Sequence, residues 1–111
     1  MSPSYTLWES NMASAVSSGL LTATAATQIG QPGRNLLNGL IAISDNTNPA
    51  TVTVYDNGNG VASGTVLAKL TATSTTGANS LALVQPIRAK FGLVVSVTGT
   101  GNPQAIVLYG A

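Results

Sequence analysis

Apolar and polar residues alternate along most of the chain, and this period of two constrains the fold more than any other feature. In residues 51–55, Val52 and Val54 fall on one face and the threonines on the other. Successive side chains of a β-strand point to opposite faces, so this alternation predicts a half-buried strand. Val and Thr are branched at Cβ and fit a pleated sheet better than a helix.

Further strand candidates follow the same pattern. Two more apolar faces are predicted, one from Val66, Ala68 and Leu70, and the other from Phe91, Leu93, Val95 and Val97. Additional candidates are residues 20–29, 36–43, 80–84 and 105–109. Between these runs lie pairs such as Asn57-Gly58 and Asn59-Gly60, which favour tight hairpin turns because both residue types accept a positive φ.

Short strands separated by turn residues are typical of a sandwich or barrel. We therefore expect an all-β fold, an antiparallel β-sandwich that is jelly-roll-like, with about seven or eight short strands, and an immunoglobulin-like sandwich as second choice. Residues 1–14 show no clean period, so we predict an irregular N-terminal arm there and one sandwich domain over residues 15–111. A chain of 111 residues has the length of a single domain.

The side chains of conventional catalysis are almost absent. The sequence has no histidine and no cysteine, which removes the usual general base, disulfides and thiolate metal sites. Its acidic residues are Glu9, Asp45 and Asp56. The two aspartates flank a predicted strand about 20 Å long, so they should lie at opposite ends of the sandwich. We expect no enzyme activity, no cofactor and no metal site.

One acidic loop invites a second interpretation. Residues 56–60 read Asp-Asn-Gly-Asn-Gly, which resembles the start of a calcium-binding loop. An EF-hand needs an acidic ligand at its twelfth position, where this chain has Leu67. A hairpin turn is the favoured interpretation, with a loosely bound surface cation as the alternative.

Charged residues make up only 6% of the chain and the formal net charge is +1. Ordinary soluble domains carry about 25% charged residues. One interpretation is an exposed surface coated with Thr and Ser. The other is a surface covered by partner proteins, because depletion of charge marks the centres of interfaces and a net charge near zero favours association.

Five residues are candidates for partner binding. Tyr5 and Trp8 lie in the predicted arm, which either tucks Trp8 against the core or docks on a neighbouring subunit. Arg34, Arg88 and Lys90 form the second group, with Arg88 and Lys90 on one strand face. They are either a solvated edge that discourages strand pairing or a contact to an acidic partner. The net charge of +1 gives little electrostatic attraction for nucleic acid, so none is expected as a partner.

No export or membrane segment is expected. Residues 1–5 have neither a basic region nor a following apolar region, so no signal peptide is predicted. No window of about 18 apolar residues exists that would cross a membrane. A β-rich protein made in the cytoplasm but suited to the outside is typical of virion proteins, which are assembled inside the host cell.

Two stretches resemble small virion proteins of tailed bacteriophages. The first is Val-Thr-Val-Tyr-Asp-Asn at residues 52–57 followed by Gly-Thr-Val-Leu at 64–67. The second is Pro-Ile-Arg-Ala-Lys-Phe-Gly-Leu-Val-Val at 86–95, with Ala-Ile-Val-Leu-Tyr at 105–109 closing the chain. The chain is similar to capsid decoration, or cement, proteins over residues 34–109.

The resemblance implies a protein on the outer surface of the virion, made in the host cytoplasm. Such proteins bind the assembled lattice of the major capsid protein, often as homotrimers, and stabilise it. No site residues carry over from the group. Alternatives are a tail or head-fibre component, or a carbohydrate-binding β-sandwich module, although the chain has few aromatic residues to stack on sugars.

Overall fold

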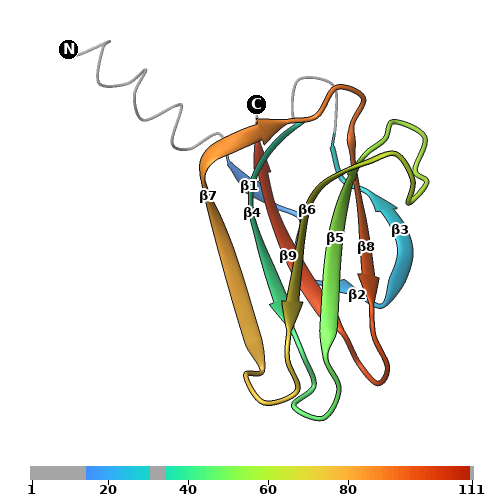
Figure 1. Cartoon of the computed structure of the whole chain (residues 1–111). Coiled ribbons are helices and arrows are strands. Elements are labelled where there is room, and N and C mark those ends of the chain that lie inside the picture. The colour runs from blue at the N-terminus through green and yellow to red at the C-terminus, as the bar shows by residue number, and fades with distance from the viewer. Residues whose placement is uncertain (1–14, 31–34, 111) are drawn as a thin grey trace, which may run out of the picture.

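The computed structural model describes residues 15–30 and 35–110, and within these ranges the chain forms nine strands and no helix (Figure 1). The predicted arm, including Tyr5 and Trp8, lies outside the described residues, as does Arg34. The strands are β1 (Val16–Ser17), β2 (Leu21–Thr22), β3 (Thr24–Gln28), β4 (Leu36–Ile43), β5 (Ala50–Asp56), β6 (Thr65–Ala72), β7 (Ala78–Arg88), β8 (Leu93–Thr98) and β9 (Gln104–Gly110).

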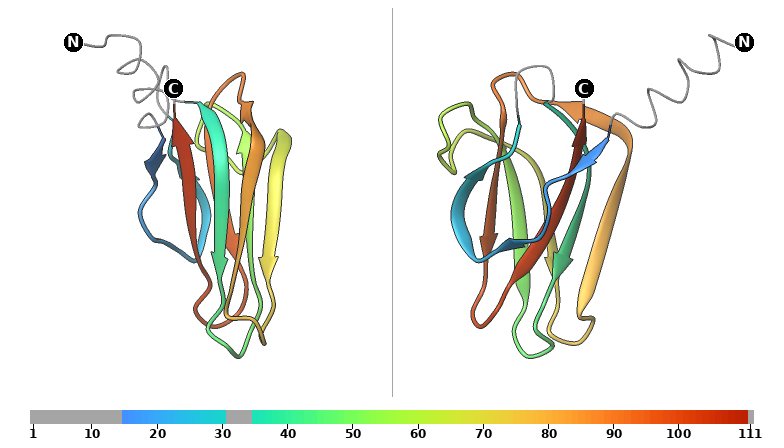
Figure 2. Two further views of the ribbon diagram at one scale, coloured as in Figure 1. Left: turned by 90° about the vertical axis from the view of Figure 1, so that its left-hand side faces the viewer. Right: turned by 180° about the vertical axis from the view of Figure 1, so that it is seen from behind.

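The strands form two packed antiparallel sheets (Figure 2). One sheet has the order β1-β9-β4-β7, with β2 also paired to β9, and the other has the order β3-β8-β5-β6. The pairing is nested, because β5 pairs with β6, β4 with β7, β3 with β8, and β1 and β2 with β9. A long hairpin rolled into two sheets has this topology, which is the predicted jelly roll.

The predicted strand number was seven or eight, and the difference lies at the start of the domain. β1 and β2 pair with the same strand, β9, and are separated by residues 18–20. The Ser18 N–H still donates to the Val107 carbonyl, but the Val107 N–H donates to the Ser18 hydroxyl instead of a backbone carbonyl, and Gly19, with a φ of 76°, follows. The two pieces are one interrupted strand, so the sandwich has the eight strand positions of a jelly roll.

The core lies between the sheets and is built from small aliphatic side chains. Val52 and Val54 of β5 are fully buried, as their alternation predicted. The whole cluster of buried residues is Leu37, Leu40, Ala42, Val52, Val54, Ala72, Ala89, Leu93, Val95, Val97, Ala105 and Val107.

Two predicted inward positions face solvent instead. The register of β5 with β6 shifts between Val54 and Tyr55, so that Leu67 is an extra residue and Val66 pairs with Tyr55. This bulge leaves Val66 50% exposed, whereas Leu67 packs against the core. Phe91 precedes β8 rather than belonging to it, and its side chain is 65% exposed.

The edge strand β7 is bent. Leu37 pairs with Ile87 and Gly39 with Ala82, so four residues of β7, numbers 83–86, lie opposite Asn38 alone. Pro86 belongs to this bulge, and Val84 projects from it with 98% of its side chain exposed. Figure 1 shows the upper part of β7 turning across the end of the sandwich. A bulge and a proline both hinder further strand pairing at an edge.

The core assignment predicts a large difference between two substitutions. Leu40→Ala should lower the free energy of unfolding by about 2–5 kcal/mol, because a buried leucine leaves a cavity. Val84→Ala, on the neighbouring strand, should change it by no more than about 0.5 kcal/mol. Urea unfolding curves of both variants and the parent chain measure the two effects, and equal losses would contradict the assigned core.

Candidate functional site

Two connections meet at one end of the sandwich, here called the loop end (Figure 1). The first, residues 57–64, joins β5 to β6, and the second, residues 89–92, joins β7 to β8. The first connects two antiparallel neighbours, so residues 56–60 do begin a hairpin connection, but it is a loop of eight residues rather than a tight turn, and among residues 57–60 only Gly60 has a positive φ. The second crosses from one sheet to the other.

Asp56, the last residue of β5, holds the second connection in place. Its carboxylate accepts hydrogen bonds from the backbone N–H groups of Lys90 at 2.8 Å, Phe91 at 2.7 Å and Gly92 at 3.4 Å. The Asn57 N–H donates to the Gly92 carbonyl at 3.2 Å, which continues the contact beyond the strand. These bonds fix the backbone from which Lys90 and Phe91 project.

The first connection is shaped by two Asn-Gly pairs. The Asn57 side chain accepts a hydrogen bond from the Asn59 N–H at 2.7 Å and donates one to the Ser63 carbonyl at 3.2 Å. An added Cβ at Gly58 would lie 3.0 Å from the Phe91 carbonyl oxygen, so glycine lets the two connections approach closely.

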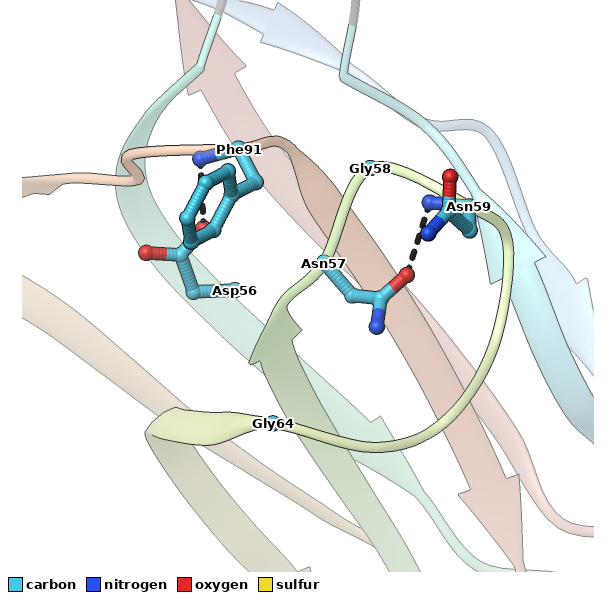
Figure 3. Close-up of a pocket in the computed structure, with 6 residues that line it drawn as sticks. All are labelled: Asp56, Asn57, Gly58, Asn59, Gly64 and Phe91. Carbon is cyan, nitrogen blue, oxygen red and sulfur yellow. Dashed lines mark hydrogen bonds between the residues drawn. The ribbon is translucent and has the colours of Figure 1, made fainter.

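A pocket of about 390 Å³ lies between the two connections (Figure 3). It is lined by Asp56, Asn57, Gly58, Asn59, Gly64 and Phe91. In Figure 3 the ring of Phe91 stands beside Asp56 on one side of the hollow, and Asn57 and Asn59 lie on the other. The pocket therefore combines an aromatic surface with carboxylate and amide groups.

Exposed apolar side chains also lie at this end of the sandwich, and one of them, Phe91, lines the pocket. Phe91 is 65% exposed, Val61 53% and Val66 50%, and all three lie at the loop end. The Lys90 ammonium lies 5.5 Å from the centre of the Phe91 ring, within the range of a cation–π contact. We call Val61, Val66, Lys90 and Phe91 the loop-end patch, because apolar groups rimmed by polar ones are typical of interaction surfaces.

The structure describes two of the five predicted partner-binding residues, Arg88 and Lys90. Tyr5, Trp8 and Arg34 lie outside the described residues. Arg88 and Lys90 are both exposed, but only Arg88 belongs to β7, which it ends; Lys90 lies in the following turn, after the buried Ala89. The prediction that Arg88 and Lys90 share one strand face was therefore wrong, because β7 ends before Lys90.

Phe91 and Val61 were not among the predicted site residues. Phe91 was assigned to the inward face of the following strand, because its spacing fits that alternation. Gly92, which follows it, was the sequence signal that a turn intervenes.

The two aspartates lie at opposite ends of the sandwich, as predicted: Asp56 ends β5, and Asp45 lies in the connection from β4 to β5. The Asp45 carboxylate accepts N–H bonds from Asn48 at 2.7 Å, Thr47 at 2.9 Å and Asn102 at 3.1 Å. These bonds, from Asn48 first and then Thr47 and Asn102, lower the pKa of Asp45 to about 2. For Asp56, burial raises the pKa, but the N–H bonds from the turn and the charge of Lys90 outweigh it, so the pKa is lowered. Both carboxylates therefore favour the ionised form.

The described residues hold little else of chemical interest. Within residues 15–30 and 35–110, no three His, Cys, Asp or Glu side chains gather closely enough to hold a metal ion. The same part of the chain has no helix that is long and apolar enough to cross a membrane. Nor does it contain a buried side-chain polar atom without a hydrogen-bond partner.

Comparison with known proteins gives no family. No protein-family model matches the chain, and no curated protein does. Among solved structures, the chain is similar to one from Bacillus endospore appendages, described as a novel family of disulfide-linked pili. The two share 17% identity over 86% of this chain and 84% of the other, with a TM-score of 0.40. A likeness this distant carries no conclusion about function.

The aspartate geometry predicts a loss of stability in acid. Because the pKa of each carboxylate is lower in the folded chain than its usual value of 3.8, folding is favoured when both are ionised. That contribution is present above the unfolded pKa and is lost as the pH falls from about 4 towards 2. Urea midpoints measured across this range should fall less in Asp45→Asn and Asp56→Asn than in the parent. A double variant that kept the full acid dependence would contradict the assignment.

Proposed function

We propose that this chain is a structural virion protein, a capsid decoration or cement protein without enzyme activity, and that it docks through the loop-end patch. The observation that carries the docking surface is that Phe91 is exposed at the pocket, while Val61 and Val66 are exposed in and just after the neighbouring connection from β5 to β6. Five large apolar side chains are exposed in the described part of the chain, and these are three of them. The patch and the sequence resemblance together support the role.

The chemistry of the patch indicates the chemistry of its partner. The apolar side chains gain by leaving water when they are covered. Lys90 gains if the partner places a carboxylate near it, and Arg88 lies two residues away on the edge strand β7. The partner surface should therefore be apolar with an acidic rim, and we propose the outer surface of the major capsid protein.

The stabilising mechanism is mass action. A protein that binds the assembled lattice but not the separated subunits adds its binding free energy to the lattice. This role needs no catalytic group. It needs many copies that bind without aggregating, and the bulged β7 edge hinders strand pairing between copies.

Oligomerisation belongs to the same proposal. A homotrimer would match a three-fold position of a capsid, and residues 1–14 with Tyr5 and Trp8 would reach a neighbouring subunit. A chain with 6% charged residues has little electrostatic repulsion between its copies.

One observation favours a second candidate function. Phe91 stands exposed beside a pocket that also presents Asn59 and Asp56, and sugar-binding sites combine a ring face with such hydrogen-bonding groups. A carbohydrate-binding module, on a tail or head fibre for example, would use the same end of the molecule.

The docking proposal predicts the effect of Phe91→Ser on binding to shells. The shells are assembled from the major capsid protein encoded by the same genome, and binding is measured by co-sedimentation. The variant should bind at least about tenfold more weakly, because an exposed aromatic anchor is lost. Leu20→Ser, which removes a side chain of similar exposure away from the patch, should bind like the parent.

The docking experiment separates the two functions. Absence of any binding to the shells would refute the cement role. Binding of a glycan array by the parent, abolished in Phe91→Ser, would establish the carbohydrate module instead.

The proposed trimer predicts the native mass. Light scattering after size exclusion should give three times the chain mass of 11.1 kDa at both a low and a high concentration. Deletion of residues 1–12 should shift it towards one chain if the arm joins the subunits. An unchanged mass after this deletion would refute the proposal that the arm joins the subunits. A monomeric parent would refute the proposal that the free chain is a trimer.

A further inference from the structure

We propose that Asn59 is a site of spontaneous deamidation and that the fold protects the other two Asn-Gly pairs of the chain. The sequence contains three such pairs, at residues 38–39, 57–58 and 59–60. They share the same local chemistry and differ in how the structure holds them. The inference does not depend on the proposed function.

The reaction at Asn59 requires no partner but water. The backbone nitrogen of Gly60 attacks the side-chain carbonyl carbon of Asn59, a carbon–nitrogen bond forms, and the amide nitrogen leaves as ammonia. Water then opens the cyclic imide to aspartate or isoaspartate. Glycine in the second position favours the attack because no side chain shields its nitrogen or restricts its φ.

The surroundings of Asn59 leave this attack open. Asn59 is exposed, and its side-chain amide makes no hydrogen bond with the described residues. Gly60 has a φ of 71°, and the only atom near the position of an added Cβ is Gln28 Oε1 at 3.8 Å. No described backbone group accepts a hydrogen bond from the Gly60 N–H.

The other two pairs are restrained. At Asn57 the side-chain oxygen accepts from the Asn59 N–H and the side-chain nitrogen donates to the Ser63 carbonyl, so both bonds must break before the amide can turn. Asn38 lies inside β4 at a bulge in both ladders, and the Gly39 whose nitrogen would attack is paired in register with Ala82 on one side and Leu108 on the other. Gly39 is buried, and an added Cβ there would lie 2.9 Å from the Leu81 carbonyl oxygen, so its backbone has no room to move.

Conversion of Asn59 would change the electrostatics of the pocket. A second carboxylate would line it beside Asp56, and the formal net charge of the chain would fall from +1 to neutral. An isoaspartate would in addition lengthen the backbone of residues 57–64. The product is therefore recognisable both by charge and by peptide cleavage.

The test is peptide mapping by mass spectrometry after incubation of the folded chain at mildly alkaline pH. Asn59 should convert about tenfold faster than Asn57, since releasing two hydrogen bonds costs Asn57 about 1.4 kcal/mol of activation. Asn38 should remain unchanged over the same time. Conversion of Asn57 or Asn38 as fast as Asn59 would overturn the proposal.

Two controls separate the fold from the local sequence. In concentrated urea at the same pH, all three pairs should convert at similar rates; a persisting preference for Asn59 would show that the fold is not its cause. In folded Gly60→Ala, conversion of Asn59 should slow markedly while Asn57 keeps its rate. If Gly60→Ala left Asn59 unchanged, the attack by the Gly60 nitrogen would be refuted.

Discussion

The carboxylate of Asp56 organises the loop end of this molecule. It ends β5 and accepts three backbone hydrogen bonds from residues 90–92, which are more than thirty positions away in the sequence. Hydrogen bonds to an ionised acceptor are roughly twice as strong as neutral ones. The position of Phe91, one wall of the pocket and the position of Lys90 all follow from this contact.

Asp45 has the same role at the opposite end. It holds the connection from β4 to β5 against the turn from β8 to β9, through the N–H of Asn102. Both acidic residues of the described part therefore accept hydrogen bonds from the backbone of a connection between the two sheets.

Hydroxyl groups take the place of charges on the sheet surface. The exposed Thr51 and Thr71, on adjacent strands, share a hydrogen bond of 3.0 Å between their hydroxyls. Threonine hydroxyls can hydrogen-bond to one another across neighbouring strands, and the branched threonine side chain packs well on a pleated sheet. A chain so poor in charge can therefore fold as an ordinary sandwich.

Much of this fold could be predicted from the sequence. The alternation at Val52 and Val54 and the turn chemistry of residues 57–60 were sufficient for the sandwich class. The errors in the prediction concerned which face of a strand single residues occupy. Bulges shift the period by one residue, so Val66 changed face, and nothing in the sequence of β6 marks the extra residue Leu67.

The site was less predictable than the fold. Phe91 looked like a core residue because its spacing matches Leu93 and Val95, yet the strand begins only at Leu93. The missing information was the contact of Asp56 with the turn, which is a long-range interaction that no local pattern encodes. Only Lys90, chosen for its charge, was identified in advance as part of what became the loop-end patch.

The two walls of the pocket differ in how they are held. The wall that carries Phe91 is fixed by the three bonds to Asp56, whereas beyond Asn57 the other connection is held by its own short contacts, such as that between Ser63 and Val61 at 2.9 Å. A partner that docks here would meet, on one side, an aromatic group whose backbone is held by Asp56 and, on the other, a loop held by hydrogen bonds within itself. Preorganisation lowers the ordering cost of binding, so the fixed wall should supply most of the affinity. Deamidation of Asn59 would act on the wall formed by residues 57–64 and would alter the charge near the partner without displacing Phe91.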